Sequence, residues 1–175
     1  MLKKITLTLI LVLIVAFQVS VATFAYTFDN LKSYSVYYAQ HTPHKPGTEP
    51  VLMELADNLF WVNTPDIDGI DYDFDGGNTI YNYNYNIPDT PYFTSFRYNE
   101  YAYLSSKYVF YTFDKNFQLN FAMDRNDKVV DLSTVDVEEL KREIYRTVQP
   151  VIDAQYAPWI NLQWLYDWVN KDKFN

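Results

Sequence analysis

The fold is decided by residues Tyr108 to Leu132, which read YVFYTFDKNFQLNFAMDRNDKVVDL. From Phe117 to Met123 apolar residues alternate with polar or small ones, and turn-forming runs at 114–116 and 124–127 bound this stretch. Alternation between turn signals predicts strands with one buried and one solvated face. We therefore expect a three-stranded antiparallel meander, with Phe121 in mid-strand on the buried face.

A second alternating stretch lies upstream, over residues 70–86. Aromatic residues alternate with aspartates before Gly76-Gly77-Asn78, and tyrosines alternate with asparagines after it. Glycines beside Asp and Asn between two alternating runs predict a hairpin, because such turns need positive φ. Two further strands are expected over 92–98 and 101–104, with a bulge or turn at residues 99 and 100.

Apolar residues at helical spacing predict three helices. The first spans Pro50 to Phe60, the second is capped by Ser133 or Thr134 and ends or kinks at Pro150, and the third runs from Pro158 to about Val169. Trp164 and Trp168 lie four residues apart and are expected in the core stripe of the last helix. The pattern predicts an α+β fold, a twisted antiparallel sheet of hairpin plus meander with helices packed on one face, two of them C-terminal.

The N-terminus has the three-part layout of a secretory signal. Lys3 and Lys4 precede an apolar run from Ile5 to Phe17, and small residues follow up to Ala25. Cleavage after Ala22 or Ala25 is expected, which makes residues 1–25 a signal peptide and residues 26–175 a single secreted domain.

The alternative is an uncleaved membrane anchor. No charged residue occurs from Ile5 to Phe28, and about 20 apolar residues suffice to span a bilayer. In both cases the folded part lies outside the cytoplasm. After cleavage, no membrane association is expected.

Composition excludes several classes of function. The chain has 14 Lys and Arg against 22 Asp and Glu, for a net charge of −8, whereas nucleic-acid binding needs clustered basic residues. It has no cysteine, which excludes disulfides, thiolate metal sites and a cysteine nucleophile. An exported domain without cysteine fits a bacterial protein better than a eukaryotic one.

An aspartate run is the clearest candidate site for a cofactor, Ca²⁺. Asp71, Asp73 and Asp75, followed by Gly76, reproduce the first half of a calcium-binding loop. The second half departs from the pattern, since asparagines stand where such a loop has an apolar residue and a bidentate Glu. The alternative is a hairpin with three carboxylates on the solvated face of a strand.

Catalytic signals are sparse. His41 and His44 share one proline-containing loop, and nothing nearby supplies a third metal ligand. The chain has no Gly-x-Ser-x-Gly motif and no glycine-rich phosphate loop. A carboxylate pair for glycan hydrolysis stays open, and it would use residues such as Glu54, Glu100 and Asp114.

Aromatic residues give the remaining signal, with 17 Tyr, 12 Phe and 4 Trp. Tyr81, Tyr83 and Tyr85 project from one face of a strand, where they either bind a ligand or, as we expect, pack against the helices. The sequence thus predicts a non-enzymatic exported binding module for a protein partner or cell-surface glycan, stabilised by calcium if the aspartates bind it. The alternative is a small extracellular hydrolase that cleaves glycans with Asp and Glu side chains.

Overall fold

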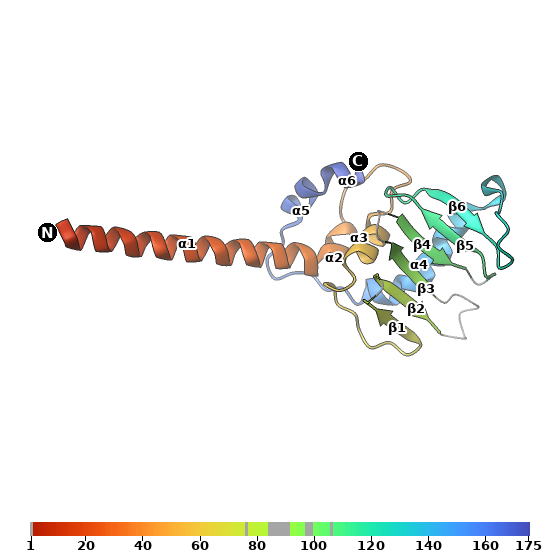
Figure 1. Ribbon diagram of the computed structural model, residues 1–175, viewed down its shortest axis with the longest axis horizontal. Coiled ribbons are helices and arrows are strands. Elements are labelled where there is room, and N and C mark those ends of the chain that lie inside the picture. The colour runs from red at the N-terminus through yellow and green to blue at the C-terminus, as the bar shows by residue number, and fades with distance from the viewer. Residues whose placement is uncertain (1, 76, 84–91, 97–99, 106) are drawn as a thin grey trace.

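The computed structural model describes residues 2–75, 77–83, 92–96, 100–105 and 107–175. A long helix, α1 (Leu2–Ser33), projects from an α+β domain as a straight rod (Figure 1). The other elements follow in the order α2 (Ser35–Ala39), α3 (Pro50–Asn58), β1 (Ile70–Asp73), β2 (Thr79–Asn82), β3 (Tyr92–Phe96), β4 (Glu100–Leu104), β5 (Phe110–Phe113), β6 (Leu119–Met123), the 3₁₀ helix η1 (Leu132–Thr134), α4 (Val137–Asp153), α5 (Gln163–Val169) and α6 (Lys171–Phe174).

The six strands form one antiparallel sheet in sequence order, β1 to β6. The predicted hairpin is β1 and β2, and Gly77 in its turn has a φ of 141°. The third strand expected before Leu132 is reduced to a single bridge between Met123 and Val129. The predicted bulge near Asn99 lies outside the described residues.

Helices pack on one face of the sheet, as predicted. Helix α4 crosses behind the strands in Figure 1, and its Leu140, Ile144 and Val148 are buried against this face. Tyr103 and Phe113 point into the same core from β4 and β5, and both are fully buried. We call this side of the sheet the helical face and the opposite side the open face.

Phe121 does not lie on the buried face, so this prediction is wrong. The pairing of β5 with β6 shifts between Thr112 and Phe113, which places Phe121 opposite Thr112 and Ala122 opposite Tyr111. Ala122 is fully buried and Phe121 half-buried. The extra residue of this bulge inverts the alternation that the sequence indicates, because side chains on a strand change face at every residue.

Helix α3 lies within its predicted range, whereas the boundaries of α4 differ from the prediction. The Asp136 side chain caps α4 by accepting a 2.9 Å hydrogen bond from the Glu139 N–H. Ser133 and Thr134, the predicted caps, lie instead in η1. Pro150 lies inside α4, which loses one backbone donor there and continues to Asp153.

The C-terminal helix begins at Gln163 rather than at Pro158. Its fully buried residue is Tyr166, while Trp164 and Trp168 are 69% and 72% exposed, so the predicted core stripe is wrong. The physical reason is helical geometry, because residues two positions apart point about 200° away from each other. With Tyr166 facing the core, both tryptophans face outward.

Candidate functional site

The strand register lines up apolar residues on the open face. Tyr81 of β2 pairs with Tyr92, Tyr92 with Leu104, Leu104 with Phe110 and Phe110 with Met123. Neighbouring strands lie about 4.8 Å apart, so this row extends roughly 19 Å across five strands. Tyr81, Leu104, Phe110 and Met123, here called the open-face row, are half-buried and lie outside the hydrophobic core cluster.

Tyr81 and Tyr83 lie together at the β2 end of this row. Their rings are parallel to within 7°, with centroids 5.8 Å apart, and Tyr83 is 51% exposed. The expectation that these tyrosines pack against the helices is wrong, because Ile80 and Asn82 occupy the helical face of β2 and are buried. Tyr85 lies outside the described residues.

Asp71 and Asp73 share the open face of β1, with Asp71 directly opposite Tyr81. Both carboxylates accept local hydrogen bonds, Asp71 from the Tyr72 N–H and Asp73 from the Asp75 N–H, each at 2.9 Å. Asp75 lies beyond the end of β1. Within the described ranges, no three Asp, Glu or His side chains come close enough to hold a metal ion. The aspartates therefore form an acidic border to the open-face row.

Sequence reasoning missed Leu104, Phe110 and Met123 as surface residues. The available signal was that Phe110-Tyr111-Thr112-Phe113 is bulky at both parities, whereas a strand with one solvated face alternates bulky and polar residues. Such a strand has large side chains on both sides of the sheet. Which side the helices cover is not encoded in that pattern.

The histidines and two of the candidate catalytic carboxylates serve local structure. His41 Nδ1 lies 3.0 Å from the Tyr37 carbonyl oxygen, and His44 Nδ1 lies 3.0 Å from that of Thr42. Asp114 accepts hydrogen bonds from the N–H groups of two residues in the β5–β6 turn. The Glu100 side chain lies outside the described part of the chain.

Glu54 belongs to an ionic network that holds the C-terminus on α3. It is 3% exposed, and it accepts hydrogen bonds from Lys173 and from Asn58. Lys173 also bonds Asp57 at 3.0 Å. Burial alone lowers the pKa of Lys173, but the carboxylates of Glu54 and Asp57 outweigh it and raise that pKa above its ordinary value. This pairing compensates the buried charge of Glu54 and gives it a structural role.

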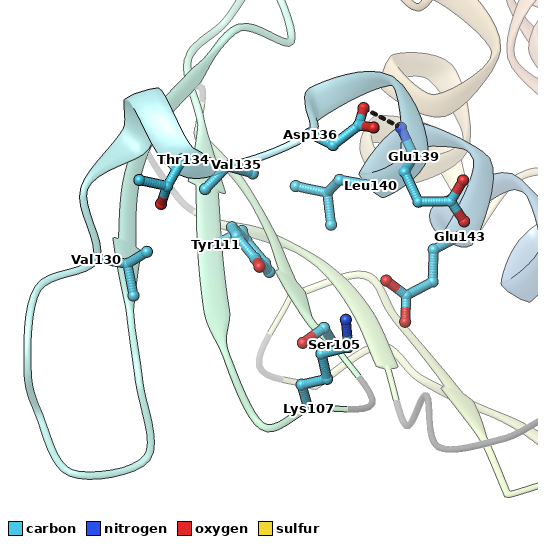
Figure 2. Close-up of a pocket in the computed structure, with 10 residues that line it drawn as sticks. All are labelled: Ser105, Lys107, Tyr111, Val130, Thr134, Val135, Asp136, Glu139, Leu140 and Glu143. Carbon is cyan, nitrogen blue, oxygen red and sulfur yellow. Dashed lines mark hydrogen bonds between the residues drawn. The ribbon is translucent and has the colours of Figure 1, made fainter.

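A cavity of about 310 Å³ lies at the helical face, between β5, the β4–β5 turn, η1 and the start of α4 (Figure 2). Its polar side chains include Asp136, Glu139 and Glu143 from α4 and its cap, facing Lys107. Burial, followed by the charge of Glu143, raises the pKa of Tyr111 in its wall. Hydrogen bonds from Arg142 lower the pKa of Glu139.

The chemistry of this cavity is limited. Glu139 is bound by Arg142 and Arg146 at 2.8 and 3.1 Å, and the Asp136 carboxylate caps α4. Glu143 is the remaining acid in the lining. Two of the three acids in the lining are thus engaged in contacts along α4, and the third, Glu143, lies near the half-buried Tyr111.

Comparisons of the chain with protein-family models, with curated proteins and with solved structures gave no match. The open face, the cavity and α1 are therefore the features of this protein from which a function can be inferred.

Proposed function

We propose that this protein is a non-enzymatic binding module that works outside the cytoplasm, is held in the membrane by α1, and binds its partner through the open face of the sheet. The observation that carries the binding role is the open-face row, four apolar side chains aligned across strands β2 to β6 on the side away from the helices. Apolar side chains that a protein leaves accessible on one face are typical of interaction sites.

The composition of the open face favours a protein partner over a glycan. Leu104, Met123 and the 63%-exposed Val129 are aliphatic, and they extend the surface well beyond the two tyrosines. Tyrosine, phenylalanine and methionine are enriched at protein interfaces, whereas sugar binding needs aromatic faces with polar groups around them. Asp71 and Asp73 give one border a negative charge, which suits a partner with basic residues at that border.

Retention of α1 is supported by its length and its exposure. Residues 8–33 form a continuous helix whose most apolar 18-residue window has a mean hydropathy of 2.4, and none of that window is buried in the protein. The helix runs unbroken through Ala22 and Ala25, the expected cleavage sites, into the segment that packs on the domain through Phe28 and Asn30. Ser20 and Thr23 direct their hydroxyl groups to backbone carbonyls four residues earlier, both at 2.8 Å, so these groups are satisfied in lipid.

Lys3 and Lys4 at the start of α1 favour an orientation with the N-terminus in the cytoplasm, as the positive-inside rule states. The domain then lies on the outer side. Fractionation of cells, with mass spectrometry of the N-terminus, tests this part of the proposal. Recovery of the intact chain in membranes is expected, and a soluble form beginning at Thr23 or Tyr26 would establish the secreted alternative.

Site-specific photo-crosslinking in the native host tests the binding surface. A photoreactive amino acid at position 83 or 129 on the open face is expected to trap a partner protein, because both side chains are more than half exposed beside the row. Position 149, exposed on α4 across the sheet, is the matched control. Adducts at 149 with none at 83 and 129 would contradict the proposal, and binding to a glycan array that Tyr83→Ala abolishes would identify a sugar ligand.

A glycan-cleaving hydrolase is the second candidate function, and the cavity in Figure 2 gives it a location. Glu143 would act there as the acid or base beside Tyr111. Glycan hydrolysis by the purified chain that Glu143→Gln abolishes, with the melting temperature unchanged, would favour this function over the binding module. Thr134→Val, in the same lining but without a titratable group, is the control.

A further inference from the structure

All four tryptophans of the chain are exposed. Trp61, Trp159, Trp164 and Trp168 have 42%, 101%, 69% and 72% of their surface accessible. Tryptophan is usually buried to a large extent in a soluble domain, because its ring carries more apolar surface than any other side chain. Exposure of every tryptophan therefore indicates a surface that is covered in the working protein.

These residues surround the point where α1 enters the domain. Trp61 packs edge-on against Phe28 of α1, with ring centroids 6.1 Å apart and an interplanar angle of 87°. The Asn30 side chain of α1 donates a 3.2 Å hydrogen bond to the carbonyl of Ile160, the neighbour of Trp159. Helix α5, which carries Trp164 and Trp168, lies beside the same end of α1 (Figure 1).

The length of α1 places this end at the bilayer surface. The uncharged segment from Ile5 to Phe28 measures roughly 36 Å at 1.5 Å per residue. The hydrocarbon core is about 30 Å thick, so about 20 residues from Ile5 cross it and the last turn of the segment emerges on the far side. Phe28 and its contact Trp61 then lie at the depth of the outer headgroups, just before Asp29, the first charged residue after the span.

We propose that an aromatic collar, made of Phe60, Trp61, Trp159, Ile160, Trp164 and Trp168, inserts into the outer headgroup region of the bilayer that α1 spans. Indole rings suit this region because an apolar ring can enter the acyl boundary while its N–H bonds headgroups or water. The surface continues the lipid-facing side of α1, whose Phe24 and Tyr26 are also exposed. This inference rests on retention of α1 as proposed above.

The collar has a consequence for the orientation of the binding surface. In Figure 1 the rod of α1 lies in the plane of the picture and α4 passes behind the strands, so the open face is turned to the viewer. With α1 along the membrane normal, the open face looks sideways, parallel to the membrane surface. A collar held in the headgroups fixes that orientation, because one helix alone would leave the domain free to tilt.

Tryptophan fluorescence reports directly on the collar, because all four tryptophans of the chain belong to it. The full chain is reconstituted in vesicles of neutral phospholipid, and its fluorescence is quenched either by lipids brominated near the headgroup or by iodide in the water. We expect strong quenching by the brominated lipid and at least a several-fold loss of iodide quenching relative to the free indole of N-acetyltryptophanamide. If iodide quenches the tryptophans of the vesicle-bound protein fully and the brominated lipid does not quench them, the proposal of a membrane-inserted collar is wrong.

A matched variant controls for the position of the fluorophore. Tyr108→Trp in a chain with all four tryptophans replaced by phenylalanine places one indole two residues before β5, a strand that lies on the side of the domain away from α1 (Figure 1). Position 108 is 61% exposed. Its indole is expected to be quenched by iodide and not by lipid. Lipid quenching at both places would mean that the domain lies on the membrane without a specific collar, which also overturns the inference.

Single-tryptophan forms keep the test valid if the four-fold replacement fails to fold, since each replaces only three exposed rings. The experiments give different results if α1 is not a membrane anchor and if the aromatic collar does not enter the headgroup region. If α1 is removed in cells, fractionation detects the shortened chain in the soluble fraction. If α1 is retained and the collar is wrong, the intact chain is in the membrane and its tryptophans stay accessible to iodide.

Discussion

The Tyr38 hydroxyl group donates a 2.6 Å hydrogen bond to Asn30 Oδ1, joining the end of α1 to α2. The Tyr38 hydroxyl oxygen in turn accepts a 3.0 Å hydrogen bond from the backbone N–H of Leu162, at the start of α5. Tyr38 and Asn30 are both buried. One phenol therefore connects α1, α2 and the segment that leads into α5.

Tyr38→Phe tests this junction. We expect a loss of about 1–3 kcal/mol in the free energy of unfolding, because the buried side-chain oxygen of Asn30 and the half-buried N–H of Leu162 both lose this partner. Tyr37→Phe, one residue earlier and half-buried, is the control and should change little. Chemical denaturation followed by circular dichroism measures both variants, and equal stabilities for them would show that the junction contributes nothing.

Phe113→Ala and Phe121→Ala should differ strongly. Phe113 is fully buried and its ring stacks on that of Phe117 at 4.5 Å, so its truncation should cost about 3–5 kcal/mol. Phe121 is half-buried on the open face, so its truncation should cost about 1 kcal/mol. The difference in the denaturation midpoints is the readout. A larger loss of stability for Phe121→Ala than for Phe113→Ala would mean that Phe121 lies on the helical face of the sheet, as its sequence alternation predicts.

Stability should fall at alkaline pH. Burial first, and then the nearby carboxylates Asp57, Glu49 and Glu54, raise the pKa of Tyr101, Tyr145 and Tyr166 respectively. A pKa that is higher in the folded state means that folding favours the protonated form. The contribution is complete below the unfolded-state value of about 10 and is lost as the pH rises above it.

Melting temperatures measured between about pH 8 and pH 11 are therefore expected to be level at first and to decline above about pH 10. Lys173, whose pKa is also raised, acts in the same direction. Tyr145→Phe removes one titrating group and should make the decline shallower. A flat profile through the whole range would contradict the burial of these phenols.

Calcium should not stabilise the domain more than sodium at matched ionic strength. Asp71 and Asp73 lie on one face of β1, about 7 Å apart, and Asp73 is engaged with the Asp75 N–H. In the ranges that the structure describes, no third acidic or histidine side chain joins them around a common point. Thermal melts in calcium, in chelator and in sodium measure the effect. A calcium-specific increase that Asp73→Asn removes would establish the site that the aspartate spacing suggests.

The sequence predicted the fold class and most of the elements because those depend on local properties. Period-two alternation with turn residues located β1, β2, β5 and β6, and helical spacing located α3 and α4. The sequence did not predict which residues of a strand or helix face the core, or where some helices begin. The β5–β6 bulge reversed Phe121, Asp136 rather than Ser133 or Thr134 became the cap of α4, and Trp164 and Trp168 turned outward.

The sequence by itself determined the apolar N-terminal segment, the α+β composition and the exclusion of thiol chemistry, because each of these is a property of residue types and their spacing along the chain. The tertiary structure decided which face of the sheet the helices cover, and hence that Tyr81, Leu104, Phe110 and Met123 form one row. It also brought Trp61 beside Phe28, and Ile160 beside Asn30. Surfaces of this kind join residues that are far apart in sequence, and only strand register and helix packing bring them together.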